Sequence, residues 1–320
     1  MKRIVQLLLL ALALAAGCVG AQEFPRQPIR IIVPFAPGTA ADTVARVVAE
    51  ELRASLSQPV EIEHRPGATG LVGIGSLARA PADGYTIGLG IDATHVTIPL
   101  LKKKLAYDPV NDFTPLTLAV RTTMAIAVNP ALLPVNDVNG LLQAARTRTG
   151  GLQFGTMGEG SPQQLIGELL KQRTGAPFAH VPYAGSAAAI EDLLAGKLPM
   201  VITPLATVLA HQDKLRIIAV ADAVRLPTFP ALPAIAETVP GVVLTGWAGF
   251  FAPAKLPPAV AAKLSAALAA ALRKPAVIEA LRKRSMEPAA SSADEFRALL
   301  KSELATWAPV VEKAQLQKGD

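Results

Sequence analysis

The residues of this sequence with the clearest chemical role are those that start helices next to glycines, because such helix starts can bind an anion. Thr39 stands where an amphipathic pattern begins, and Asp42 follows three residues later, in the spacing of a capping box. Ser161 repeats the device, because Pro162 suits the first helical position and Gln164 stands three residues on. A cap leaves the earliest amides of a helix unbonded, and with the helix dipole they attract an anion. These two starts predict an anion held between two halves of the chain.

A third helix start is expected at Ser186, whose side chain would cap a helix that runs through Ile190. Each helix end contributes only about 0.3–1 kcal/mol to anion binding when it is exposed. Micromolar affinity requires about 8 kcal/mol, so several converging donors are needed. The amide of Gly38, in the loop before Thr39, is expected to be one of them.

Motifs for catalysis, metals and nucleotides are mostly missing. No serine has the flanking glycines of a G-x-S-x-G elbow. The four histidines (His64, His95, His180 and His211) lie far apart and form no metal-binding spacing. The stretch from Gly155 to Gly160 follows a strand, but its glycine order and the lack of a following lysine argue against a nucleotide loop. We expect no enzyme, no cofactor and no metal; an exported hydrolase using Ser161 or Ser186 is the enzymatic alternative.

The composition argues against a nucleic-acid partner. Lys and Arg number 31 against 25 Asp and Glu, a net charge of +6 with no dense basic block. Nine Phe, three Tyr and two Trp offer few platforms for stacking bases. One cysteine, Cys18, excludes a disulfide framework.

The first segment has the features of an export signal. Lys2 and Arg3 precede an apolar run from Ile4 to Ala16, which is shorter than the roughly 20 residues of a membrane span. Cleavage after residue 21 would release a cysteine-free chain into the periplasm. Ala15 to Cys18 also fits a loose lipobox, so lipid anchoring at Cys18 stays open.

Short apolar strands alternate with amphipathic helices along the rest of the chain. Pro28–Phe35 reads as a buried strand and the pattern from Val44 to Leu56 as a helix, and the second half repeats the alternation. A long strand is expected from Leu116 to Val128, and a Pro-rich connection leads to another at Ala248–Phe251. The alternation predicts an α/β fold with mostly parallel sheets flanked by helices, in two lobes. Ligands of such folds bind where strands end and helices begin.

The sequence resembles the Bug or TctC-like family, the substrate-binding receptors of tripartite tricarboxylate transporters. The resemblance covers about Phe24 to Leu316, and its separate motifs occur in the family's order. The matching stretches are Pro34–Gly38 with Asp42, Arg65–Ala68 with Gly70, Asp83–Thr86, Tyr107–Pro109 with Asp112, Phe113 and Pro115, Gly158 with Gly160, Ser161, Glu168 and Leu169, Val181–Tyr183 with Gly185 and Ser186, and Trp247 with Gly249, Ala252 and Pro253.

The resemblance implies the two-lobed periplasmic binding-protein architecture, of type II, with two crossovers acting as a hinge. Lobe 1 would be residues 24–121 plus 247–320 and lobe 2 residues 122–246, after a signal peptide at 1–21. The strands Leu116–Val128 and Ala248–Phe251 would be the crossovers.

The resemblance also implies a ligand site made by loops of both lobes. In the family the first strand-to-helix loop holds the ligand carboxylate. The residues implied for this site are Phe35, Gly38, Thr39, Ala40, Asp42, Gly70, Thr94, His95, Gly158, Glu159, Gly160, Ser161, Gln164, Gly185, Ser186 and Thr203.

Several positions depart from the family's usual residues. Thr39 and Thr69 replace glycines, and His64 replaces an asparagine. Gln164 stands where histidine is common, and Ala184 where lysine is. An acidic residue often present at Thr203 is missing, which disfavours an amino-acid ligand. The changes favour recognition by neutral hydrogen-bonding groups.

The resemblance implies a monomeric periplasmic receptor that closes around a small organic carboxylate, aromatic or hydroxylated, and delivers it to two membrane subunits. An orphan receptor that feeds a sensor or signalling partner is the alternative, and the sequence does not separate the two.

Overall fold

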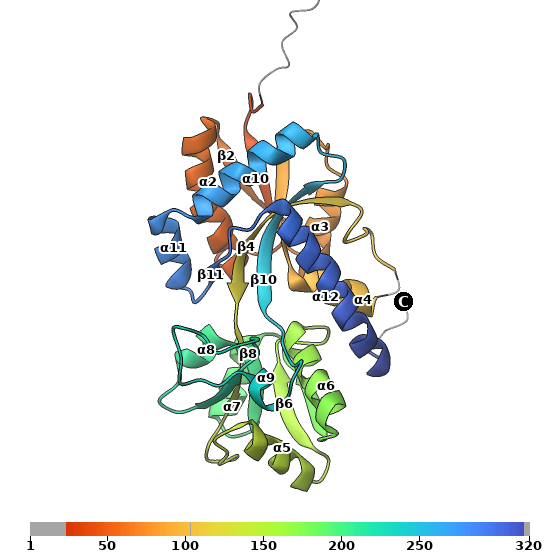
Figure 1. The fold of residues 1–320 in the computed structure, drawn as a ribbon, viewed down its shortest axis with the longest axis vertical. Coiled ribbons are helices and arrows are strands. Elements are labelled where there is room, and N and C mark those ends of the chain that lie inside the picture. Colours follow the sequence, from red (N-terminus) through yellow and green to blue (C-terminus); the bar gives the residue numbers. More distant parts are fainter. Residues whose placement is uncertain (1–23, 103, 317–320) are drawn as a thin grey trace, which may run out of the picture.

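The computed structural model describes residues 24–102 and 104–316, which form two sheets in two stacked lobes (Figure 1). The expected signal peptide and Cys18 lie outside the described residues. None of the helices in this part of the chain combines the length and the apolar character required to cross a membrane.

The first sheet has six strands in the order β11-β4-β10-β3-β1-β2. Strands β1 and β2 pair in parallel, as do β1 and β3, whereas β10 is antiparallel to both β3 and β4. The strands are β1 Ile29–Val33, β2 Val60–His64, β3 Thr86–Ile91, β4 Phe113–Thr122, β10 Gly246–Pro253 and β11 Glu287–Pro288. The expected parallel pairing therefore holds for β1, β2 and β3, whereas β4 pairs only antiparallel, with β10 and β11, so the sheet as a whole is mixed.

Helices cover both faces of the first sheet because β1 is apolar on both sides. Ile29, Ile31 and Val33 pack in a core with α2 and α10, while Ile32 packs on the other face with α3. The helices of this lobe are α2 Ala40–Leu56, α3 Leu71–Ala78, α4 Ile98–Leu101, α10 Pro258–Leu272, α11 Pro275–Arg282 and α12 Ala293–Lys313.

The second sheet has five strands in the order β7-β6-β8-β5-β9. Strand β6 is parallel to β7 and β8, and β5 is antiparallel to β8 and β9. Its strands are β5 Met124–Val128, β6 Leu152–Thr156, β7 Phe178–Pro182, β8 Met200–Pro204 and β9 Arg216–Val220. Its helices are α5 Val138–Thr147, α6 Pro162–Thr174, α7 Ser186–Leu194, α8 Leu205–Leu209 and α9 Ile235–Thr238.

The chain passes between the sheets at two neighbouring points. The run expected as one strand from Leu116 to Val128 is in fact two strands, because Thr123 separates β4 in the first sheet from β5 in the second. The chain returns through β10, whose Gly246 pairs with Thr122. These changes of sheet lie next to the lobe boundaries expected at residues 121/122 and 246/247, which we retain as a proposal.

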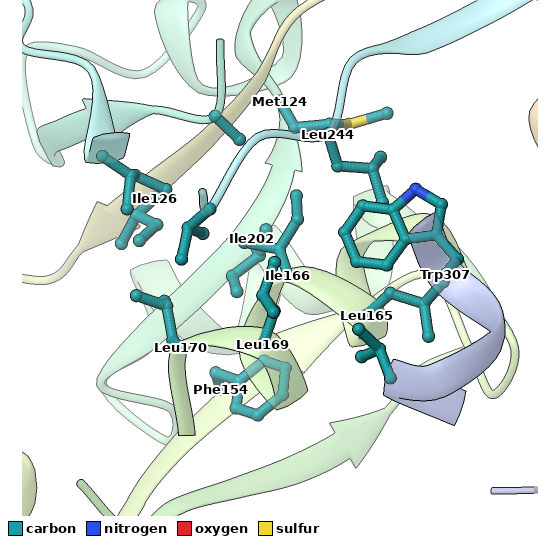
Figure 2. Packing of buried hydrophobic residues seen from close by; sticks show 14 of the residues in the cluster. Met124, Ile126, Phe154, Leu165, Ile166, Leu169, Leu170, Ile202, Leu244 and Trp307 are labelled. Carbon is teal, nitrogen blue, oxygen red and sulfur yellow. The ribbon is translucent and has the colours of Figure 1, made fainter. Parts of the chain in front are cut away.

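Helix α12 provides a further contact between the lobes. It packs against β4 and also against α6 of the second lobe, where Gln172 Nε2 donates to the Val310 carbonyl at 2.9 Å. Trp307 is buried in one hydrophobic cluster with Leu165 and Leu169, and its indole lies beside Leu165 in Figure 2. Movement of one lobe against the other therefore has to involve the contacts of this helix as well as the two crossovers.

Candidate functional site

The first candidate loop joins β1 to α2 at the carboxyl edge of the parallel strands. Phe35 and Thr39 are partly buried, and Ala36 to Gly38 and Ala40 are exposed. Thr39 caps α2 as expected, since its Oγ1 accepts from the Asp42 amide at 3.4 Å and donates to the Ala36 carbonyl at 3.0 Å. The cap fixes the loop against the first turn of the helix.

The Gly38 amide is already used within the protein. It donates to Asp42 Oδ2 at 2.8 Å, so it does not point to a ligand as the sequence suggested. The amides of Thr39, Ala40 and Ala41 have no acceptor among the described residues. The donors of this loop are therefore the first-turn amides of α2 rather than the glycine before them.

Asp42 is the most heavily hydrogen-bonded acid near the loop. Its side chain is 4% exposed, and besides Gly38 it accepts from Arg46 Nε at 2.9 Å and faces His64 Nε2 at 2.8 Å. Burial acts to raise the pKa of Asp42, but the hydrogen bonds from Arg46, Gly38 and His64 outweigh it and lower the pKa to about 2. The carboxylate is therefore charged at any physiological pH.

A second loop of this lobe meets the first at Gly70, which has a φ of 93°. A Cβ at Gly70 would lie 2.9 Å from Thr94 Cγ2 and 3.1 Å from Phe35 Cζ, so a larger residue does not fit without movement. The structure thus brings together three predicted site residues, Phe35, Gly70 and Thr94, from three separate segments of the chain.

Thr94 and His95 lie beneath these loops with no exposed surface. The Thr94 hydroxyl accepts from the Ile91 amide at 3.0 Å and lies 2.9 Å from His95 Nδ1. The His95 ring stacks on Phe251 with centroids 4.0 Å apart. Burial lowers the pKa of His95 to about 3, so the ring is neutral. In this conformation both side chains are fully buried and make their contacts within the protein.

In the second lobe, the loop between β6 and α6 has the same hydrogen-bond pattern as the loop before α2, but with neutral Gln164 in the place of Asp42. Ser161 caps α6 as expected, accepting from the Gln164 amide at 3.4 Å, and the Gly160 amide donates to Gln164 Oε1 at 2.7 Å. Pro162 has no amide to offer. A Cβ at Gly160 would lie 2.8 Å from Leu101 Cδ1 of α4, so this loop reaches the first lobe. Helix α6 therefore has few amides left for an anion.

Helix α7 presents an uncapped start instead. The expected cap is wrong: Ser186 is the first helical residue, and Gly185 is the N-cap without a side-chain bond. The amides of Ser186, Ala187 and Ala188 have no acceptor among the described residues. The second lobe thus offers its unbonded amides through α7.

The remaining predicted residues, Thr203, Glu159 and Gly158, all come from the second sheet or the loop after β6. Thr203 is 2% exposed on β8, and its hydroxyl has no partner among the described residues. Glu159 is exposed, and Gly158 bonds through its amide to Thr156 Oγ1 at 3.2 Å. That hydroxyl also lies 2.7 Å from His180 Nε2, and burial lowers the pKa of His180 despite the charge of Glu159. That these residues together form a ligand site remains a prediction.

Two residues that the sequence did not assign to the site, Arg46 and His64, contact Asp42. Arg46 follows Asp42 by four residues on α2, a spacing from which the ion pair could have been predicted. His64 comes from β2, and only the pairing of β2 with β1 brings it to Asp42. Among the described residues no cluster of histidine, cysteine and acidic side chains could hold a metal ion.

Comparisons with known proteins agree on one family. A family model described as tripartite tricarboxylate transporter family receptor matches residues 44–316. Protein BugT of Bordetella pertussis is 33% identical over 308 residues, covering 95% of this chain and 94% of BugT. A protein of R. palustris solved with adipate is 33% identical, with a TM-score of 0.79 over 92% of this chain and 99% of that one. MatC of Rhodopseudomonas palustris, solved with bound malate, is 29% identical, with a TM-score of 0.75 over 90% of this chain and 100% of that one.

Proposed function

The chain belongs to the tripartite tricarboxylate transporter receptor family, and from this premise we propose that it captures a small organic carboxylate in the periplasm. The receptor closes its two lobes around the ligand and delivers it to the two membrane subunits of a tripartite transporter. It carries out no chemistry on the ligand.

The observation that carries this proposal is the set of unbonded amides at the start of α2. They follow the exposed residues Ala36 to Gly38 at the carboxyl edge of the first sheet, where ligands of α/β folds bind. The amides of Ser186, Ala187 and Ala188 at the start of α7 offer a second group of donors from the other lobe. Hydrogen bonds to a charged acceptor are worth about 1.5–3 kcal/mol each, so three or four of them account for micromolar affinity.

Two neutral residues among the predicted site positions favour a ligand without a positive charge. Thr203 and Gln164 are neutral, and neither can balance an ammonium group as a carboxylate would. The relatives solved with adipate and malate hold dicarboxylates, which lack an ammonium group. We therefore propose simple or hydroxylated carboxylates, including aromatic ones, rather than amino acids.

Thermal unfolding with a panel of acids tests the ligand class. The panel holds adipate, malate, benzoate and glutamate, with glucose and a dipeptide blocked at both ends as the uncharged comparison. A carboxylate at 100 times its dissociation constant should stabilise the protein by about 2.7 kcal/mol. A shift with glucose or the dipeptide and none with the acids would remove the proposed ligand class.

Delivery to a transporter and periplasmic location are supported by the family and by its solved relatives, one of which is a periplasmic transporter structure. We propose that the receptor acts as a monomer. Uptake of the identified carboxylate should stop when the gene is deleted and return when the receptor is restored. Normal uptake in the deletion strain, with loss of a transcriptional response to the ligand, would favour the signalling role.

A further inference from the structure

We propose that Thr69 determines the specificity of the receptor, because its side chain hydrogen-bonds a hydroxyl group on the ligand carbon next to the carboxylate. The proposal rests on the proposed function, since it concerns the same ligand site. The ligand class narrows accordingly to 2-hydroxy carboxylates, with one carboxylate or two.

The loop that carries Thr69 joins β2 to α3 and has an unusual backbone. Its residues Gly67, Ala68, Thr69 and Gly70 have φ values of 141°, 46°, 56° and 93°. Thr69, with a ψ of 35°, is in the left-handed helical conformation. Glycine adopts this conformation freely, whereas a β-branched residue in it is a genuine outlier. Thr69 therefore introduces backbone strain at a position where glycine would introduce none.

The contacts of Thr69 with the described residues do not offset this strain. The residue is exposed, so its side chain gains nothing from burial. The turn is closed by its neighbours, because the Gly70 amide donates to the Gly67 carbonyl at 2.9 Å. The Thr69 hydroxyl makes no hydrogen bond with another described residue. Strained residues of this kind cluster at ligand sites, where the strain serves the function.

The position of the loop places Thr69 beside the carboxylate site. Strand β1 lies between β2 and β3 and is parallel to both, so the segments that follow these strands leave the same edge of the sheet. A Cβ at Gly70, the next residue after Thr69, would lie 3.1 Å from Phe35 Cζ in the loop before α2. The loop of Thr69 thus adjoins the loop that leads to the unbonded α2 amides. We therefore assign to its hydroxyl the ligand substituent nearest to the carboxylate.

The loop also offers backbone donors to the same substituent. The amides of Ala68 and Thr69 have no acceptor among the described residues. A threonine hydroxyl both donates and accepts, so it can bond a ligand hydroxyl in either direction. When the lobes close, an acid without that hydroxyl leaves these polar groups away from water and without a partner, which lowers its affinity.

The test is the preference of matched variants within pairs of acids that differ only in this hydroxyl. Titration calorimetry compares malate with succinate, 2-hydroxyadipate with adipate, and mandelate with phenylacetate. In the pair that it binds best, the wild type should bind the hydroxylated acid about 3- to 10-fold more tightly. T69V keeps the branched shape without the hydroxyl and should lose this preference, whereas T69S keeps the hydroxyl and should retain it. The ratio of two affinities within one variant cancels any general effect on the loop.

T149V is the matched control, because Thr149 is an exposed threonine that precedes β6, at the amino edge of the second sheet. It should show the preference of the wild type. Equal binding of both acids of a pair by the wild type, or an undiminished preference in T69V, would overturn the role of Thr69 while the receptor function stands. If none of these acids and no other carboxylate binds, the proposed function fails as well.

A second variant, T69G, removes the strain together with the hydroxyl and keeps the proposal testable if T69V does not fold. It should melt about 2–4 °C above the wild type and lose the preference as T69V does. A melting temperature below that of the wild type would contradict the strain assigned to Thr69. A retained preference in T69G would contradict the contact between its hydroxyl and the ligand.

Discussion

The Gly160 amide donates to the side-chain oxygen of Gln164 at 2.7 Å. In the other lobe the Gly38 amide donates to Asp42 at 2.8 Å, across the same spacing of four residues. Both bonds hold a glycine loop against the helix that follows it. They differ in charge, because Gln164 is neutral and Asp42 is an ionised acid that requires Arg46 and His64 beside it.

Gln164→Ala removes the support of the second loop. It leaves the Gly160 amide without its acceptor in a region where Gln164 is 7% exposed. We expect the free energy of unfolding to fall by about 1–2 kcal/mol. Urea denaturation measures this fall, with the exposed Gln143→Ala as the control, expected within about 0.5 kcal/mol of the wild type. Equal losses in the two variants would show that the Gly160 bond contributes nothing to stability.

Asp42→Asn should change the acid stability of the protein. The lowered pKa of Asp42, about 2, means that its charged form stabilises the folded state above the unfolded pKa near 4. This contribution is lost as the pH falls from about 4 toward 2. At pH 7 it is fully present, and Asp42→Asn should therefore lower the free energy of unfolding there by about 2 kcal/mol. Chemical denaturation from pH 2 to 7 should show a flatter profile for Asp42→Asn. A profile parallel to that of the wild type would contradict the ion-pair assignment.

Asp92 contributes a pH dependence of stability opposite to that of Asp42, because its pKa is raised rather than lowered. Burial, together with the charge of Glu303, raises the pKa of Asp92 to about 8, and one of its oxygens has no hydrogen-bond partner among the described residues. The folded state keeps a proton that the unfolded chain releases near pH 4. Stability is therefore greatest below pH 4 as far as this group is concerned, and it falls as the pH rises toward 8.

Asp92→Asn should abolish this loss and stabilise the protein by at least about 1 kcal/mol at pH 8.5. Glu303, whose pKa burial raises to about 7, should give a smaller effect of the same sign in Glu303→Gln, which keeps an acceptor for the Trp247 indole at 2.7 Å. Melting temperatures from pH 5 to 9 check both variants against the exposed Asp213→Asn. If Asp92→Asn still loses stability across this range as the wild type does, the buried proton is assigned to the wrong group.

Local signals in the sequence predicted much of the fold. The β-branched run before Phe35 forms β1, and the caps at Thr39 and Ser161 begin their helices as expected. Ser186 does not cap α7, because the place where the chain turns after β7 depends on tertiary contacts and puts Gly185 outside the helix instead. The strand expected from Leu116 to Val128 divides because its two halves pair with different sheets.

The candidate site could be predicted less well from the sequence, because it too depends on contacts between separate elements. Spacing along one helix indicates Thr39 with Asp42, but not that the Asp42 side chain reaches back to Gly38. The contact of Asp42 with His64 requires the register of β1 and β2, which no local pattern encodes. Contacts within one element are thus predictable, whereas those between elements need the fold.

Ala40→Pro tests the central claim most directly, because it deletes a single unbonded amide. Ala40 is the first residue of α2, where proline is tolerated, and Thr39 has the extended backbone (φ −72°, ψ 166°) that a following proline requires. Ser161 and Pro162 already show this arrangement in the second lobe. Ala293→Pro makes the same change at the start of α12, after the extended Ser292, and serves as the control.

The measurement is titration calorimetry of the wild type, Ala40→Pro and Ala293→Pro with the carboxylate that stabilises the wild type most. We predict that Ala40→Pro folds with wild-type stability but binds at least about 10-fold more weakly, as the loss of one hydrogen bond to a charged group requires. Ala293→Pro should bind as the wild type does. Wild-type affinity in a folded Ala40→Pro would contradict the claim that the α2 amides hold the ligand.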